Sequence, residues 1–286
     1  MINAVIGTGI VGTKIAEVLL QKNETVIVYN RTIEKTVHLG SLGARVGTDI
    51  ADVLGQAECI ILTLSNKKAI DDTLFARQYS FKNKMIIQMG TISPEESIEI
   101  YEKVRNSGGD YLECPILGSR REIEQKNLIT MVGGDPTLFK KWQTFFSFFG
   151  PDCYYIGKVG QATALKLAIN QIIASHVAGF SLSLGMVEQN QISTDLFMEI
   201  LKKSSLYAPM FEKKMPNWQR QNYSDPNFSV KNLLKDVRLI ADHADGKGLN
   251  TAIIRSIEAV LETSVEEGFE HLDYSSVYHT INRNKQ

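Results

Sequence analysis

The stretch Ile2–Asn23, INAVIGTGIVGTKIAEVLLQKN, decides the fold class of this chain. A short apolar run ends at Gly7, and apolar residues with helical spacing begin directly after Gly12. A strand before a GxGxxG loop and a helix after it are the context that this motif requires. Gly7 permits a tight turn, Gly9 lets the main chain approach a pyrophosphate, and Gly12 lets helix and strand pack closely. The helix N-terminus is therefore predicted to bind a dinucleotide. The predicted binding residues are Gly7, Gly9, Ile10, Val11 and Gly12.

The end of the second predicted strand, ETVIVYN, bears on the choice of dinucleotide. An enzyme that prefers NAD usually has an acid there to hold the ribose 2′-hydroxyl, but here the residues are Asn30, Arg31 and Thr32. An acid would repel a 2′-phosphate, whereas Arg31 offers a planar donor fork and Thr32 a hydroxyl. Asn30 can still bond to the ribose. The pattern favours NADP, and the alternative is that Arg31 is a solvated turn residue.

Strands and helices alternate through the rest of the first half. Apolar strand patterns at 58–64, 84–89 and 128–134 are separated by helical segments, which predicts an open, doubly wound α/β sheet of the Rossmann type. In such a sheet the loops after the strands form the ligand crevice, so Leu64 and Ser65 are expected to contact the cofactor.

The region from Gly157 to Asn190 predicts one long helix of about 45 Å, long enough to link two domains. Its apolar residues are not confined to one stripe, which is typical of a buried helix. Lys166 and Asn170 stand four residues apart and therefore on one face. Either Lys166 extends its charge from an apolar helix to water, or it donates a proton to a substrate that Asn170 holds.

Composition limits the classes of partner. The 286 residues include 31 basic and 32 acidic side chains with no basic block, so neither nucleic acid nor an acidic membrane is expected as a partner. No secretory leader and no run of eighteen apolar residues is present, which indicates a soluble, cytoplasmic protein. The three cysteines suit reduced thiols, and the five histidines show no paired spacing, so no metal site is predicted.

The length fits two domains. Residues 1–160 are predicted to form the dinucleotide-binding domain, and the helical patterns of residues 161–286 predict an all-helical domain for substrate binding and dimerisation. So long an apolar helix exceeds what one small helical domain can cover. A partner subunit is therefore expected to cover part of it, in a homodimer or homotetramer.

Several ordered motifs carry a resemblance to a known family. The segments GTGIVG, NRT, PILGS, GKVGQATALKLAIN and FSVKNLLKDVRLIAD together resemble the β-hydroxyacid dehydrogenase family, which includes 3-hydroxyisobutyrate dehydrogenase. The resemblance covers essentially the whole chain. Within the family, the chain is most similar to the glyoxylate/succinic semialdehyde reductase group.

The resemblance implies roles for individual residues. Lys166 matches the catalytic lysine and Asn170 a substrate-orienting residue. Leu117 departs from the family pattern, where a serine would offer a hydroxyl to the substrate carboxylate, and this puts the choice of acid in doubt. The resemblance also places Thr91 on the nicotinamide side of the cofactor, Lys235 toward the cofactor or the substrate, and Gly118 and Ser119 at the substrate carboxylate. Phe228 belongs to an aromatic and sulfur-rich group just before Lys235, and it is either a core residue or part of the substrate site.

The resulting expectation is an NADPH-dependent reductase of small aldehyde or keto acids, reversible as a hydroxyacid dehydrogenase, with Lys166 as general acid and base. Glyoxylate and succinic semialdehyde are the leading substrates, and 3-hydroxyisobutyrate or tartronate semialdehyde chemistry is the alternative. An imine reductase or a non-catalytic NADP-binding regulator is a further alternative, although the resemblance associates both with loss of the lysine. The physiological acid and the direction of reaction stay open.

Overall fold

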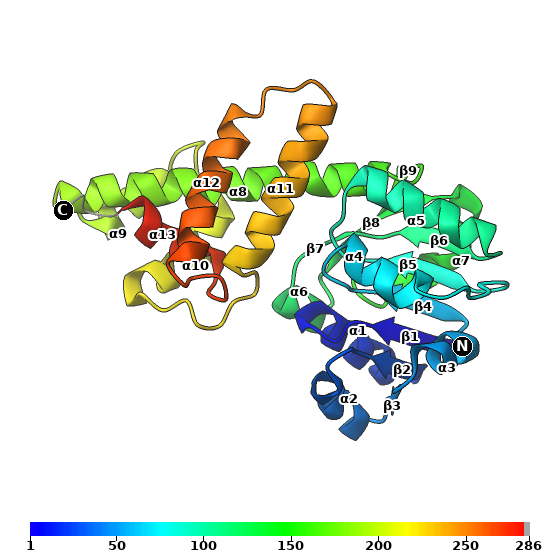
Figure 1. Ribbon diagram of the computed structural model, residues 1–286. Helices are drawn as coiled ribbons and strands as arrows, with labels where there is room; N and C mark the ends of the chain where they lie inside the picture. Colours follow the sequence, from blue (N-terminus) through cyan, green and yellow to red (C-terminus); the bar gives the residue numbers. More distant parts are fainter. Residues whose placement is uncertain (283–286) are drawn as a thin grey trace. The chain divides into compact units, whose positions relative to one another are not determined.

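The computed structural model describes residues 1–282 of the 286-residue chain (Figure 1). The chain divides into two compact units, Met1–Leu167 and Ala168–Gln286. The predicted boundary at residues 160 and 161 falls at the start of helix α8 (Gln161–Gln189), whereas this division falls one to two turns inside the helix.

The first unit contains one nine-stranded sheet (Figure 1). Its strand order is β3-β2-β1-β4-β5-β6-β8-β7, and β9 pairs with β8. The strands from β3 to β6 are parallel, while β8 runs antiparallel to β6 and β7. The order 3-2-1-4-5-6 is that of a dinucleotide-binding sheet, which confirms the predicted doubly wound fold. The strands are β1 (Ile2–Ile6), β2 (Thr25–Tyr29), β3 (Arg45–Val46), β4 (Cys59–Leu62), β5 (Met85–Gln88), β6 (Asp110–Glu113), β7 (Ile116–Leu117), β8 (Ile129–Gly134) and β9 (Cys153–Gly157).

Three helices of the first unit, α3, α5 and α7, begin at polar caps that their sequences supply. Asp49 accepts a hydrogen bond from the Ala51 amide, and Asp135 caps α7 in the same way. Ser93 and Glu96 form a capping box ahead of Pro94, as expected of a serine before a proline. These helices are α1 (Ile10–Gln21), α2 (Val37–Ser41), α3 (Ile50–Gln56), α4 (Lys67–Ile70), α5 (Pro94–Asn106), α6 (Arg120–Glu124) and α7 (Pro136–Phe146), with a 3-10 turn at Ile33–Thr36 and a π turn at Asp71–Phe75.

Two apolar clusters form the core of the first unit. One includes Val5, Ile61 and Phe146, and the other includes Ile6, Ile60 and Tyr111. Neighbours along a strand point to opposite faces of a sheet, so Ile60 and Ile61 place these clusters on its two sides. Both faces are therefore covered, as a parallel sheet requires.

The described residues of the second unit form helices joined by turns and loops, with one isolated bridge between Ser229 and Asp273. Its core contains Phe180 of α8, whose ring stacks on Phe211 with centroids 4.4 Å apart and lies 4.8 Å from the Trp218 ring. The helices that follow α8 are α9 (Thr194–Lys202), α10 (Pro209–Arg220), α11 (Val230–Gly246), α12 (Ala252–Glu266) and α13 (Val277–Ile281), with a 3-10 turn at Tyr274–Ser276 before α13.

Helix α8 is not buried all round. Ile172, Leu182 and Met186 are 54%, 53% and 61% exposed, so the expectation of a fully buried helix is wrong for this chain by itself. Because apolar side chains on one chain can be covered by another, hydropathy alone does not tell which chain covers them. By length and composition α8 could cross a membrane, a test that core helices of soluble proteins also pass.

Candidate active site

The glycine loop has the shape that a phosphate requires. Gly7 has φ +97°, in the region that favours glycine. A Cβ at Gly12 would lie 1.9 Å from the Gly7 carbonyl oxygen, so no larger residue fits between loop and helix. A Cβ at Gly9 would meet no atom within 4 Å. The main chain at Gly9 is therefore open to an approaching ligand.

The N-terminus of α1 keeps its own donors available. Its cap residue is Gly9, which supplies no side-chain acceptor, and the first turn has no acidic residue. The first amides of a helix lack intrahelical partners and favour an anion. Thr63 steadies the loop because its hydroxyl donates to the Gly7 carbonyl at 2.6 Å. These features fit the pyrophosphate of a dinucleotide.

Asn30 supports the glycine loop from the end of β2. Its amide nitrogen donates to the Thr8 hydroxyl at 2.9 Å, and its amide oxygen accepts from the Thr32 main-chain N–H at 2.9 Å. Arg31 and Thr32 are exposed next to it. Asn30 thus holds the local shape, while Arg31 and Thr32 remain the groups that could reach a ribose phosphate.

The other predicted cofactor residues follow the neighbouring strands. Leu64 comes after β4, and its side chain lies beside Gly7. Ser65 is exposed, and Thr91 is half-buried after β5. A Cβ at Gly90 would lie 2.4 Å from the Leu64 carbonyl oxygen, so these two loops touch. The structure thereby brings the loops after β1, β4 and β5 together at one edge of the sheet.

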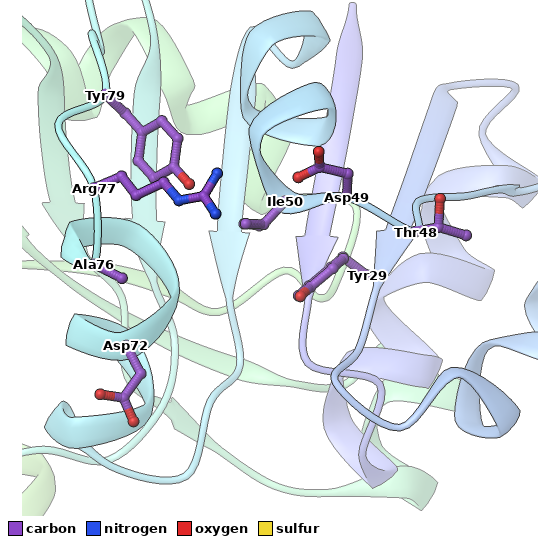
Figure 2. A pocket seen from close by; sticks show the side chains of 8 residues that line it. All are labelled: Tyr29, Thr48, Asp49, Ile50, Asp72, Ala76, Arg77 and Tyr79. Carbon is purple, nitrogen blue, oxygen red and sulfur yellow. The ribbon is translucent and has the colours of Figure 1, made fainter.

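A cavity of about 530 Å³ opens at the same edge, beyond β2 and β3 (Figure 2). Tyr29 ends β2 directly before Asn30, so the cavity adjoins the Arg31 turn. Figure 2 shows the Arg77 and Tyr79 side chains on the left, across from Tyr29 and Thr48. Sequence reasoning did not find this cavity, because its walls come from three separate segments of the chain, at residues 29, 48–50 and 72–79. They are lined by Tyr29, Thr48, Asp49, Ile50, Asp72, Ala76, Arg77 and Tyr79.

The predicted substrate loop follows β6. Gly118 has φ +125°, which accounts for glycine at that position. The Ser119 main-chain N–H donates to the Glu122 carboxylate at 2.7 Å, in the capping box of α6. A substrate carboxylate would have to replace Glu122 to use that donor. Leu117 lies in β7, where its main chain pairs with Ile129.

Two titratable groups near the start of this loop are held neutral. Burial raises the pKa of the Cys114 thiol and of the Tyr111 phenol. Both groups therefore stay protonated near pH 7. Cys114 is not activated as a nucleophile, because only the thiolate reacts.

Lys166 and Asn170 lie one turn apart on α8, as predicted. Lys166 is 9% exposed and Asn170 is 2% exposed. An ammonium is rarely buried to this degree unless it has a partner or a function. A solvated lysine that extends its charge into water would be far more exposed, so the simple surface interpretation of Lys166 does not fit.

Asp236 of α11 is a site residue that sequence reasoning missed. Its carboxylate accepts a hydrogen bond from the Asn170 amide nitrogen at 2.6 Å and lies 2.6 Å from the Lys235 ammonium. The second unit therefore brings Asn170 and Lys235 together around one buried carboxylate. The sequence signal that could have identified Asp236 is an acidic residue on the apolar face of α11, between Leu233 and Val237.

Phe228 precedes α11. Its ring meets the Tyr274 ring edge-on, with centroids 5.8 Å apart, and its carbonyl accepts from the Tyr274 N–H. The side chain is half-buried. Its predicted contact with a substrate stays a prediction.

The fold and the glycine loop define a dinucleotide-binding protein, and comparisons with known proteins identify its class. Residues 3–157 match the family described as the NAD binding domain of 6-phosphogluconate dehydrogenase. Residues 160–281 match the family described as NAD-binding of NADP-dependent 3-hydroxyisobutyrate dehydrogenase. The chain belongs to the β-hydroxyacid dehydrogenase family, of the 3-hydroxyisobutyrate dehydrogenase type, and is an NAD(P)-dependent oxidoreductase.

Individual relatives show how far the similarity extends. The chain is 29% identical to glyoxylate/succinic semialdehyde reductase 1 of Arabidopsis thaliana, over 96% of both chains. It is 26% identical to the cytokine-like nuclear factor N-PAC of Drosophila melanogaster, over 96% of this chain but only 46% of that protein. The Mycobacterium tuberculosis 3-hydroxyisobutyrate dehydrogenase, solved with L-serine, has the same fold, with a TM-score of 0.88 at 17% identity over 99% of both chains.

Proposed function

We propose that this protein reduces small aldehyde or keto acids with NADPH, and that Lys166 is the proton donor. One observation carries the proposal: Lys166 is a buried ammonium one helical turn from Asn170, whose amide is held by Asp236. When bound, the reduced nicotinamide supplies the hydride to the carbonyl carbon. Lys166 then protonates the alkoxide, and in the reverse direction the neutral amine accepts that proton.

Two effects of Lys166 lower the barrier in this proposal. Its positive charge stabilises negative charge that develops on the carbonyl oxygen. Positioned proton transfer contributes about a hundred- to ten-thousand-fold in rate. Asn170 orients the substrate next to that proton, and the loop at Gly118 and Ser119 binds its carboxylate.

The preference for NADPH rests on the turn after β2. Arg31 and Thr32 are exposed beside the glycine loop, and no acid stands there to repel a 2′-phosphate. We place the adenosine end of the cofactor in the adjoining cavity at Tyr29 and Arg77, because ligands of such sheets bind beyond the carboxyl ends of the strands.

Glyoxylate and succinic semialdehyde are the proposed substrates, supported by the similarity to the Arabidopsis reductase along the whole chain. Leu117 leaves the substrate loop without one hydroxyl donor, which favours an acid that needs fewer polar contacts. The alternative is a 3-hydroxyisobutyrate or tartronate semialdehyde dehydrogenase. A cytoplasmic homodimer or homotetramer without membrane attachment completes the proposal.

A second candidate function is a non-catalytic NADP-binding regulator. The similarity to N-PAC favours it, since N-PAC is named as a nuclear factor. Lys166 counts against it, because the resemblance associates loss of turnover with loss of this lysine. Lys166 likewise counts against an imine reductase, the further alternative.

A substrate panel tests the proposal. Oxidation of NADPH by the purified protein is measured with glyoxylate, succinic semialdehyde, a cyclic imine and no substrate. Turnover with either aldehyde acid supports the proposal. Turnover with the imine alone identifies an imine reductase, and binding of NADPH without any turnover identifies a regulator.

A further inference from the structure

Glu113, the last residue of β6, is fully buried and makes an unusual number of contacts for one carboxylate. One oxygen accepts from the main-chain N–H groups of Ala162 at 2.8 Å and Thr163 at 3.3 Å. The other accepts from the Gly160 N–H at 2.9 Å and from the hydroxyls of Thr163 and Ser97. Glu113 therefore has five donor groups within hydrogen-bond distance, and four of them belong to the start of α8. The Thr163 hydroxyl shares its one proton with the Gly160 carbonyl, which also lies at 3.1 Å.

These contacts account for the open N–H groups at the start of the helix. The first amides of a helix have no intrahelical acceptor. Of those amides, the Gln161 N–H donates to the Lys158 carbonyl, and the other three donate to Glu113. No side chain of the preceding turn replaces Glu113 in this role. The start of α8 is thus held by a residue 47 to 50 positions earlier in the chain.

The surrounding sheet makes room for this carboxylate. Gly133 of β8 is the pairing partner of Glu113 of β6. A Cβ at Gly133 would lie 2.5 Å from a Glu113 carboxylate oxygen. On the other side, Ser97 also forms a hydrogen bond with the buried Tyr111 hydroxyl at 2.8 Å. The Glu113 side chain is therefore fixed from both sides.

Glu113 links the two parts of the first unit that the proposed reaction uses. The loop with Gly118 and Ser119 follows it directly along the chain. Lys166 lies three and four residues after Thr163 and Ala162, on the same helical face. We infer that Glu113 is a positioning residue, which holds the start of α8 and with it Lys166 in register with the substrate loop. This inference rests on the proposed function.

The substitution Glu113→Gln tests the inference with little change in size. A carboxamide has one acceptor and one donor group, so in either orientation its NH2 meets a main-chain N–H of Gly160 or Ala162. We expect kcat to fall about tenfold or more, because a misplacement of about 1 Å can cost about a hundredfold. NADPH affinity should stay within about twofold, since its phosphates bind the Gly7–Gly12 loop.

Three further variants make the result interpretable. Thr163→Val removes one hydroxyl donor and keeps the main-chain contacts, so it should fold and lose kcat by a few-fold. Glu113→Asp keeps the negative charge, and it should retain part of the activity that Glu113→Gln loses. Asp135→Asn alters a helix-capping carboxylate on α7, outside the proposed site, and should leave kcat unchanged.

Hydrogen exchange separates this inference from the proposed function. In Glu113→Gln the amides of Gly160, Ala162 and Thr163 should exchange faster, whether or not any substrate is turned over. Faster exchange together with a loss of kcat in folded protein supports the inference. Unchanged exchange, or faster exchange with wild-type kcat, overturns the inference while the proposed function stands.

If Glu113→Gln does not fold, the other two variants decide. Wild-type kcat in both Thr163→Val and Glu113→Asp overturns the inference, and a graded loss of kcat supports it. Lys166→Ala at wild-type turnover would instead overturn the proposed function.

Discussion

The Asn170 amide nitrogen donates a hydrogen bond to the Asp236 carboxylate at 2.6 Å, and both side chains are buried. A carboxylate only accepts, so it fixes which end of the Asn170 amide faces it. Within residues 1–282 the Asn170 amide oxygen has no hydrogen-bond partner. That oxygen is a buried acceptor, and in the proposed function it accepts a hydrogen bond from the hydroxyl of the hydroxy acid.

Asp236→Asn should lower kcat/KM by about a hundredfold, with KM for the acid rising. An asparagine at position 236 could donate to the Asn170 oxygen and let the Asn170 amide turn over, which removes the acceptor from the site. Steady-state kinetics and NADPH binding measure the effect. The control is Asp242→Asn on the same helix, where an exposed acid pairs with Arg255. Equal activity of the two variants would show that Asp236 does not orient Asn170.

Arg31→Ala should narrow the preference for NADPH over NADH, chiefly by weakening NADPH. We expect the wild-type protein to prefer NADPH by at least about tenfold in kcat/KM, which corresponds to about 1.4 kcal/mol. The measurement is the ratio of kcat/KM for NADPH to kcat/KM for NADH, in the wild type and in Arg31→Ala. If the wild type uses the two cofactors equally, the role assigned to Arg31 is wrong.

The exposed apolar face of α8 predicts self-association. Ile172, Leu182 and Met186 leave large apolar surface open on one chain, and burying it in a two-fold interface would be favourable. Sedimentation should show a homodimer or homotetramer at micromolar concentration. Leu182→Glu should shift it toward the monomer, because a carboxylate cannot be buried without a partner. A wild-type protein that sediments as a stable monomer would contradict this prediction.

The sequence was sufficient for the features that depend on neighbours along the chain. The glycine loop needs particular residues within six positions, and the cap at Ser93 needs Glu96 three residues later, so both were predictable. Contacts between distant segments were not predictable from the sequence. Asn170 and Asp236 are 66 residues apart, and no pattern in either helix names its partner. Ser119 and Glu122, by contrast, have the same three-residue spacing as Ser93 and Glu96, so this capping box could also have been predicted.

The π turn at Asp71–Phe75 and the cavity beside it illustrate the same limit. The residues that line the cavity come from three segments of the chain, and the approach of these segments depends on strand order. Hydropathy was also misleading for α8, since an apolar residue does not reveal whether its own chain or another covers it. Predictions made from the sequence were therefore best for main-chain shape and weakest for side chains that meet across the fold.

Lys166 carries the central claim, and two variants test it. Lys166→Ala should lower turnover by about two or more orders of magnitude while NADPH still binds, because the phosphates occupy the Gly7–Gly12 loop. Lys166→Arg should restore little, since a guanidinium hardly releases its proton. If Lys166 only extended its charge into water, arginine would preserve activity and alanine would cost stability instead.

The most direct measurement is the turnover of Lys166→Arg under saturating NADPH, with affinity for NADPH and melting temperature determined on the same preparation. We predict turnover below about a tenth of wild type, with NADPH affinity and stability preserved. Turnover above that level would contradict the general-acid role of Lys166 and would direct attention to Lys235, the lysine paired with Asp236.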